Sequence, residues 1–348
     1  MILDPILDIF RGKAITIPPL DGAFRPNTRL DDARLFAELA EADNLVASRG
    51  ELLASSGNTV FALKPGSDPA PVKSYAAPVT TLAVSPGGEI AVGLESGRLF
   101  LGEAEASLPT TVHCITALAY GPDGALWLAN GSSAHAPSDW ALDLMRHGSS
   151  GSVWKREPGG RSLRQVAGGL AFPYGLLPSE GGIVVSESWR HRLARIDAAG
   201  NVSTVIGHLP GYPARLSPTA DGGAWLAVFA PRNRLIEFVL QETQYRQEMI
   251  DTVPSQFWIA PSLSSGRSFL EPLQCGGIKT MGVHKPWSPS RSYGMAVRLD
   301  ASLQPLFSLH SRANGMRHGT CSAVELGGDL FVASKGGDCV LVLDAGGR

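Results

Sequence analysis

The sequence predicts an all-β protein, a six-bladed β-propeller, from three observations. A unit made of an apolar strand, a Pro/Gly turn and a second strand ending in small residues recurs six times. Apolar residues beside the turns alternate with a period of two, which is typical of strands. The 348 residues include 40 glycines and 25 prolines, and this density favours many short elements over long helices.

The repeats are spaced by about 40 residues where no insertion interrupts them. The six copies lie at residues 45–55, 82–93, 118–130, 175–186, 216–228 and 323–334. Four short strands fill a module of this length, and sheets stacked around an axis bury each other's apolar faces. We therefore expect residues 1–348 to form one propeller.

The chain outside the repeats is expected to close the ring and to cover it. The last unit ends after three strands, so segment 1–40 should supply the fourth, around residues 13–17. Segments 131–150 and 241–290 are insertions, and inserts of this length are usually functional. They contain helix-like stretches at 140–146 and 244–251. Both insertions are expected over one mouth of the central channel.

The charge balance argues against two classes of partner. Thirty Lys and Arg face 32 Asp and Glu, a formal charge of −2, and the basic residues are scattered, so nucleic acid is not an expected partner. No window approaches the ~18 apolar residues of a membrane span, and Asp4 and Asp8 do not suit a signal peptide. We expect a cytoplasmic protein that acts on or binds a small molecule. The sequence carries no signal for its oligomeric state.

The cysteines and the known cofactor motifs give no sign of a metal or cofactor. Cys114, Cys275, Cys321 and Cys339 lie far apart without a CxxC pair, and we interpret them as reduced thiols. Phosphate-binding loops, GxSxG elbows and HExxH helices are absent from the sequence. No cofactor is predicted.

Several short runs carry a resemblance to a known family, which extends from about residue 78 to the C-terminus. They are Leu-Met-Arg at 144–146, Gly-Ser-Val-Trp at 151–154, Phe-Pro-Tyr-Gly at 172–175, Val-Ser-Glu-Ser at 185–188 and Leu-Pro-Gly-Tyr-Pro at 209–213. With these runs the chain resembles the strictosidine synthase-like family and its adipocyte plasma membrane-associated relatives. More distantly it resembles the gluconolactonase and paraoxonase propellers. The resemblance implies a six-bladed ring with a site in its central channel.

Departures from the family pattern bear on chemistry. Metal-dependent relatives hold a divalent ion with an Asn of Phe-Pro-Asn-Gly and an Asp-Asn pair, where this chain has Tyr174, Ala214 and Arg215. Asn130 and Glu187 remain as oxygen donors, but a hard cation needs more oxygens and no adjacent guanidinium, so no metal is predicted. The plant synthases carry a carboxylate where this chain reads His318-Gly319-Thr320-Cys321.

Arg215 is the most informative candidate. A permanently charged guanidinium near the axis must find a carboxylate, and Glu187 on the neighbouring blade is the expected partner. Arg215 would replace the metal and polarise an ester or lactone carbonyl, or hold a substrate carboxylate. The alternative is a structural Arg–Glu pair.

His318 and Cys321 start the last inner strand. His318 is a candidate general base for an attacking water, and the alternative is a histidine satisfied by local hydrogen bonds. Cys321 is a candidate nucleophile if His318 lowers its pKa, and the alternative is a buried, inert thiol. Asn130 and Glu187 would orient the substrate.

Aromatic candidates for a pocket wall are Tyr174 and Trp189 on one blade and Trp258 and Trp287 in the second insertion. Trp127 and Trp225 occupy equivalent positions of the repeat and are expected to pack between blades.

Three functions are compatible with these residues. The first is a metal-independent hydrolase for a small ester or lactone, with Arg215 as electrophile and His318 as general base. The second is a non-catalytic small-molecule binder or sensor that keeps the channel without the chemistry. The third is a carbon–nitrogen condensing enzyme of the strictosidine synthase type.

Overall fold

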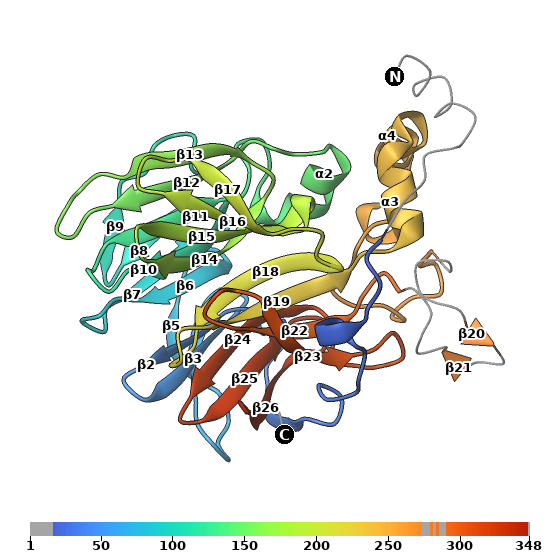
Figure 1. Cartoon of the computed structure of the whole chain (residues 1–348), viewed down its shortest axis with the longest axis horizontal. Helices are drawn as coiled ribbons and strands as arrows, with labels where there is room; N and C mark the ends of the chain where they lie inside the picture. The colour runs from blue at the N-terminus through green and yellow to red at the C-terminus, as the bar shows by residue number, and fades with distance from the viewer. Residues whose placement is uncertain (1–16, 273–278, 281–282, 285–289, 347–348) are drawn as a thin grey trace.

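Six four-stranded antiparallel sheets stand around a central channel in the computed structural model (Figure 1). The structure describes residues 17–272, 279–280, 283–284 and 290–346. The six-bladed propeller predicted from the repeats is confirmed. In five sheets, the strands follow one another along the chain from the channel outwards, and the sixth combines the two ends of the chain.

The first three blades come from the N-terminal half of the chain. Blade 1 contains β2 (Leu45–Ser48), β3 (Glu51–Ser56), β4 (Thr59–Leu63) and β5 (Ala70–Ser74). Blade 2 contains β6 (Val79–Val84), β7 (Ile90–Leu94), β8 (Leu99–Leu101) and β9 (Ala104–Ala106). Blade 3 contains β10 (Ile115–Tyr120), β11 (Leu126–Asn130), β12 (Gly151–Arg156) and β13 (Arg164–Leu170).

The other three blades continue the ring. Blade 4 contains β14 (Pro173–Ser179), β15 (Gly182–Glu187), β16 (Arg192–Asp197) and β17 (Val202–Ile206). Blade 5 contains β18 (Gly211–Pro218), β19 (Ala224–Pro231), β22 (Gly294–Leu299) and β23 (Pro305–Ser311). Blade 6 contains β24 (Thr320–Leu326), β25 (Asp329–Ser334), β26 (Cys339–Asp344) and β1 (Arg34–Glu38).

Glycines mark the turns between first and second strands for two different reasons. Gly88 and Gly124 adopt φ values of +83° and +82°, a left-handed conformation that glycine reaches without a steric penalty. In blade 4 the positive φ belongs to Gly181, and the following Gly182 lies so near the backbone of β16 that a Cβ would collide with the carbonyl oxygen of Ile196. Glycine therefore recurs in these turns either because the backbone needs a positive φ or because a neighbouring strand lies too close for a side chain.

The N-terminal segment closes the ring, but not where the sequence predicted. β1 pairs antiparallel with β26, with Arg34 opposite Val342 and Glu38 opposite Cys339. The prediction of a strand around residues 13–17 is wrong, and residues 13–16 lie outside the described part of the chain. β1 is an outer strand in which only Ala37 is buried, so its sequence lacks the apolar alternation that reveals the other strands.

A separate cluster of buried apolar side chains fills the space between each pair of neighbouring blades. Trp127 packs with Val185 and Ile196 between blades 3 and 4. Trp225 packs with Leu330 between blades 5 and 6 and is fully buried. The predicted inter-blade role of both tryptophans is confirmed, and burial of such large apolar surfaces stabilises the ring by ~25 cal/mol per Å².

Hydrogen bonds also join neighbouring blades near the channel, three of them between inner strands and one from the second strand β15 to the inner strand β18. The bonded pairs are Leu118 N with Thr81 Oγ1, Thr116 Oγ1 with Pro173 O, Ser186 Oγ with Ala214 O, and Leu45 N with Ser322 Oγ, at 2.5–3.2 Å. These bonds fix the height of one inner strand against the next, so side chains from different blades meet at one level of the channel.

The first insertion lies between β11 and β12, as predicted. It contains a 3₁₀ turn (Pro137–Asp139) and α2 (Trp140–Met145), which matches the helix-like stretch at 140–146.

The second insertion, between β19 and β22, starts earlier than the predicted residue 241. It begins with α3 (Arg234–Gln241), which the sequence analysis missed, and continues with α4 (Thr243–Thr252), a 3₁₀ turn (Ser255–Phe257) and two short strands, β20 (Lys279–Thr280) and β21 (Val283–His284). The predicted helix at 244–251 corresponds to α4. Asn233 caps α3 by accepting a hydrogen bond from Leu235 N at 2.9 Å, a signal that the sequence already contained.

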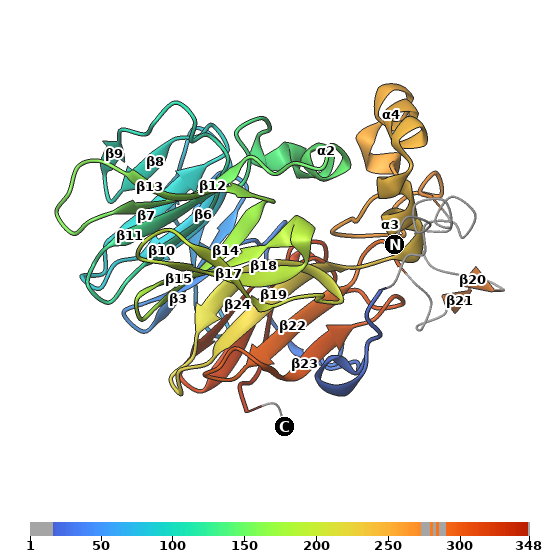
Figure 2. The same ribbon diagram turned by 45° about the horizontal axis from the view of Figure 1, so that its top comes forward.

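Both insertions lie at the same mouth of the channel (Figures 1 and 2). Met145 of α2, Ile236 and Val239 of α3 and Met249 of α4 share one apolar cluster with Phe229 of β19. No helix in the described ranges is long and apolar enough to cross a bilayer.

Candidate functional site

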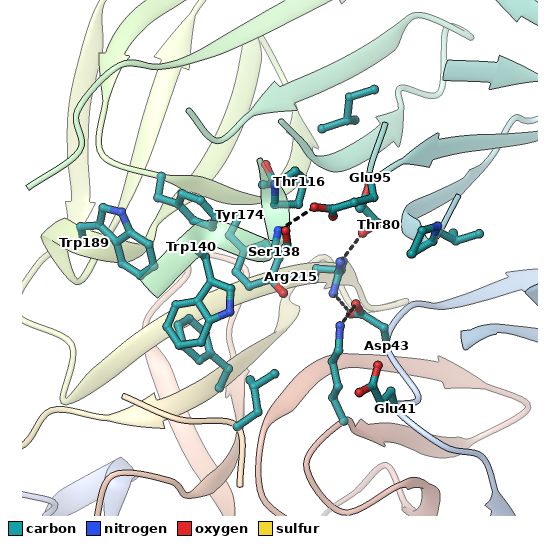
Figure 3. Close-up of a pocket in the computed structure, with 18 residues that line it drawn as sticks. Glu41, Asp43, Thr80, Glu95, Thr116, Ser138, Trp140, Tyr174, Trp189 and Arg215 are labelled. Carbon is teal, nitrogen blue, oxygen red and sulfur yellow. Dashed lines mark hydrogen bonds and ion pairs between the residues drawn. The ribbon is translucent and has the colours of Figure 1, made fainter. Parts of the chain in front are cut away.

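A cavity of about 320 Å³ opens at the channel mouth that the insertions cover (Figure 3). Its lining comes from the starts of inner strands, from residues just after second strands, and from the insertions. A charged cluster, defined as Asp43, Arg215 and Lys335, and an aromatic wall dominate its chemistry.

A break in pairing at the start of the inner strands places side chains in this cavity. Pairing with the second strand skips Thr80 in β6, Thr116 in β10 and Tyr174 in β14. The equivalent irregularity in β18 includes Arg215. Such bulges re-aim a side chain, and all four residues line the cavity.

Arg215 occupies the centre of the channel. Its Nη1 donates to Asp43 Oδ1 at 2.5 Å and to the Cys321 carbonyl at 3.4 Å, and its Nη2 donates to the Thr80 carbonyl at 2.6 Å. The guanidinium also lies 4.9 Å from the ring centroid of Tyr174. Contacts to four blades therefore hold this cation in place.

Asp43, rather than Glu187, is the carboxylate that pairs with Arg215. It lies two residues before β2, and its Oδ2 accepts a hydrogen bond from Lys335 Nζ at 2.8 Å. The side chains of Asp43 and Arg215 are 9% and 11% exposed, and that of Lys335 is 27% exposed. One carboxylate is thus shared by two cations (Figure 3).

The charged cluster keeps all three groups ionised. Burial opposes ionisation of Asp43, but the charges of Arg215 and Lys335 outweigh it and hold its pKa below the usual value. Burial likewise opposes the charge of Lys335, but Asp43 raises the pKa of this ammonium above its usual range. Burial raises the pKa of the Tyr174 phenol, which stays neutral beside them.

The aromatic wall lies beside this cluster and consists of Trp140, Phe172, Tyr174, Trp189 and Phe229, of which Tyr174 is in contact with the Arg215 guanidinium. Phe172 stacks on Trp189 at 4.5 Å between centroids, and Trp140 meets Phe229 edge to face at 5.4 Å. The indole Nε1 of Trp189 donates to Asp143 Oδ2 at 2.8 Å, so its polar edge is already bonded. The wall thus contributes mainly apolar ring surface to the cavity.

The predicted Glu187–Arg215 ion pair is wrong. Glu187 is fully buried on its own blade, where it accepts hydrogen bonds from Ala171 N at 2.7 Å, from Arg190, and from Arg192 Nε at 2.6 Å. It ends β15, and the basic residues that follow it along the chain, Arg190 and Arg192, are its charged partners. In the described structure it does not line the cavity.

Asn130 and His318 also lie outside the cavity lining. Asn130 Oδ1 accepts from Cys114 N at 2.9 Å, and its Nδ2 donates to Thr111 O at 3.2 Å, so this side chain braces the loop before β10. His318 is 4% exposed, with Nδ1 2.8 Å from Ser292 Oγ and Nε2 2.8 Å from Arg312 O. These contacts match the alternative interpretation of His318 as a histidine satisfied by local hydrogen bonds.

Cys321 lies directly beneath the charged cluster. It is the residue skipped by the pairing of β24 and is fully buried, with Sγ 3.2 Å from Gly319 O. Burial raises the pKa of its thiol to about 12. A thiol that stays protonated at neutral pH is a poor nucleophile, which matches the alternative interpretation of Cys321 as a buried, inert thiol.

The structure brings together Arg215, Tyr174 and Trp189 from the predicted set. Trp258 instead packs in the apolar cluster beneath α3 and α4, and its Nε1 donates to Val253 O at 2.7 Å. Trp287 lies outside the described residues.

Sequence reasoning missed Asp43, Lys335 and Trp140. Lys335 directly follows β25, the second strand of its blade, and Glu95, which also lines the cavity, directly follows β7, the second strand of blade 2. An alignment of the ends of the second strands would therefore have identified Lys335 and Glu95. Asp43 precedes the weakest repeat, where the register was least secure. Trp140 was predicted to be helical, but whether its side chain reaches the cavity depends on how the first insertion packs over the channel mouth.

The centre of the channel does not fit a hard divalent cation. Both oxygens of Asp43 accept hydrogen bonds from cations, and a guanidinium and an ammonium beside them would repel a metal ion. Among the described residues, no three His, Cys, Asp or Glu side chains group as metal ligands would. Arg215 and Lys335 occupy the place that an ion would need.

The fold and the site together define a six-bladed β-propeller with a ligand-sized pocket at one channel mouth. The sequence is 26% identical over 113 residues to the adipocyte plasma membrane-associated protein of Danio rerio. That match covers 31% of this chain and 27% of the relative, and it agrees with the resemblance found in the sequence. No protein-family model matches the chain.

Two solved structures described as gluconolactonases share the fold. One, from Xanthomonas campestris, superposes with a TM-score of 0.56 at 14% identity and covers 91% of each chain. A structural-genomics target, for which gluconolactonase is only a suggested assignment, gives 0.55 at 14% identity, covering 90% of this chain and 91% of its own. At this identity the likeness concerns the fold alone. The curated relative is membrane-associated by name, and a cytoplasmic location for this chain stays a prediction.

Proposed function

We propose that this propeller binds a small molecule in the central pocket without converting it chemically. The observation that carries the proposal is the pocket itself, in which a charged cluster lies beside an aromatic wall. Its volume is at the lower end of the range for small-molecule sites, and convergent polar groups in an apolar pocket are typical of such sites.

Three titratable groups at the centre of the pocket favour binding over catalysis. Asp43 is held ionised between two cations, and Tyr174 and Lys335 have raised pKa values, so these three groups are poor proton shuttles near pH 7. The predicted set of Arg215, His318 and Glu187 is not assembled around the described cavity. A binder needs only the pocket and its donors.

Thermal unfolding in the presence of a chemically broad panel of metabolite-sized compounds tests the proposal. A ligand at 100 times its Kd stabilises the fold by about 2.7 kcal/mol, which gives a clear rise in Tm. Trp140→Ala should weaken binding about tenfold or more, whereas Phe238→Ala, at an exposed position on α3, should not. A panel without any stabilising compound, or stabilisation that Trp140→Ala leaves unchanged, would contradict the proposal.

Metal-independent hydrolysis of a small ester or lactone is the second candidate. The observation that favours it is a guanidinium and an ammonium at the channel centre of a fold shared with proteins described as gluconolactonases. These cations could polarise a carbonyl oxygen. Glu41 and Glu95, which also line the pocket, are the carboxylates available to activate water.

An ester and lactone panel with and without a chelator tests the hydrolase. Turnover that survives chelation and is lost in Lys335→Met and Glu95→Gln supports it. Turnover that disappears with the chelator contradicts the metal-independent mechanism.

A further inference from the structure

We propose that the ligand of this pocket is a small carboxylate with a planar aromatic body, an inference that rests on the proposed ligand-binding function. The carboxylate would meet Lys335 beside Arg215, and the ring would lie against the aromatic wall.

The charged cluster carries more positive than negative charge. Asp43 supplies one negative charge, whereas Arg215, which is largely buried, and Lys335, which is partly exposed, supply two positive charges. Among the described residues, neither Glu41 nor Glu95 forms an ion pair with these two cations, and Glu95 Oε1 instead accepts from Ser138 N at 2.9 Å. Because the lining as a whole also carries the carboxylates of Glu41 and Glu95, this excess is local to Arg215 and Lys335, and a ligand carboxylate would balance it where it contacts these two cations.

Lys335 is the donor best placed for that anion. Its ammonium has three N–H groups, and the bond described above, to Asp43, uses one. It is also the most exposed member of the cluster, at 27%. Arg215 uses three of its five N–H groups on Asp43, Cys321 and Thr80, and its Nε, which has no hydrogen-bond partner in the described part of the chain, is buried, so Lys335 is the more accessible donor.

The aromatic wall selects the body of the ligand. In Figure 3 the labelled rings of Trp140, Tyr174 and Trp189 lie on one side of Arg215, while Asp43 and Thr80 lie on the other. Because the Trp189 indole N–H is bonded to Asp143, the wall rewards contact with a flat apolar ring more than with another polar group. A ligand that spans both sides must be apolar at one end and anionic at the other.

Four probes separate the contributions of ring and charge. They are 1-naphthaleneacetate, its neutral analogue 1-naphthaleneacetamide, the cation 2-(1-naphthyl)ethylamine and the non-planar cyclohexylacetate. Binding is measured by titration calorimetry at low ionic strength. We expect naphthaleneacetate to bind at least tenfold tighter than each of the others, and added salt to reduce this preference.

Lys335→Met should remove the preference for acid over amide. Lys64→Met, at an exposed lysine paired with Glu51, is the matched control and should keep it. Tighter binding of the amine, equal binding of acid and amide, or a preference that survives in Lys335→Met would overturn the inference.

The outcome also separates this inference from the proposed function. If the four probes fail but a panel compound without a carboxylate binds in a Trp140-dependent manner, the ligand class is wrong and the pocket stands. If no compound of either set binds, both proposals fail.

Discussion

At the scale of single residues, the site depends on a carboxylate shared by two cations. Asp43 joins blade 1 to Arg215 on blade 5 and to Lys335 after β25 of blade 6. Removing one member of a buried ion pair leaves an uncompensated charge, and this usually costs more than the pair contributes. The charged cluster therefore stabilises the fold as well as setting the charge of the pocket.

Arg215→Met should lower the free energy of unfolding by about 3–5 kcal/mol, because Asp43, Thr80 and Cys321 lose their donor. Arg98→Met, which removes an exposed pair with Glu105, should leave it nearly unchanged. Urea unfolding at pH 7 measures both. Equal effects of the two substitutions would show that Arg215 does not hold the channel centre together.

The sequence identified Arg215 but not its partner, for a physical reason. Register along the repeats places an inner-strand residue at the axis, whereas the partner depends on how blades 1 and 5 meet across the channel. Glu187 has basic neighbours in the chain, Arg190 and Arg192, and these short-range pairs decide its orientation. Local sequence could have suggested this result.

At the scale of elements, α3 is anchored to the ring through Glu237. This carboxylate accepts from Arg232 Nη2 at 3.0 Å and from the Tyr212 hydroxyl at 3.3 Å, and lies 3.5 Å from His191 Nε2. Burial opposes its ionisation, but His191 and Arg232 outweigh burial and lower its pKa to about 2. The insertion that covers the pocket therefore depends on an ionised Glu237.

Glu237→Gln should destabilise the fold by about 3 kcal/mol at pH 7. The pKa of Glu237 is lower in the folded chain than in the unfolded chain, so its stabilisation is complete above about pH 5 and is lost as pH falls towards about 2. The difference between wild type and variant should fall to less than half by pH 3. Glu248→Gln, on α4, is the control, and its free energy of unfolding should stay within about 0.5 kcal/mol of wild type at both pH 7 and pH 3. A difference that does not change with pH would argue against this anchoring role.

At the scale of the whole molecule, stability depends on a closed ring. Phe36 and Ala37 of β1 join the apolar cluster between blades 6 and 1, and Phe36 meets Phe331 at 4.8 Å between centroids. Without β1, the edge of β26 would be unpaired and this cluster open to water.

Ala37→Asp should lower the free energy of unfolding by about 3 kcal/mol or more, because it buries an unpaired charge in that cluster. Leu35→Asp places the same charge two residues away, at a side chain that is 41% exposed, and should have little effect. Denaturant unfolding followed by tryptophan fluorescence compares them. Similar losses in the two variants would mean that β1 does not close the ring.

The fold was predictable because the turns repeat, whereas much of the site was not. Glycine turns and apolar alternation are local signals, and they located six blades and both insertions. β1 escaped detection because most of its residues are exposed, and α3 because it follows directly on β19. The pocket combines several blades with an insertion, and those contacts are not encoded at any fixed spacing.

A crystal structure grown in millimolar calcium tests the central claim most directly. We predict Arg215 Nη1 and Lys335 Nζ on the two oxygens of Asp43, with no ion between them. Density for a calcium ion about 2.3–2.6 Å from Asp43, with Arg215 turned away from the axis, would contradict it.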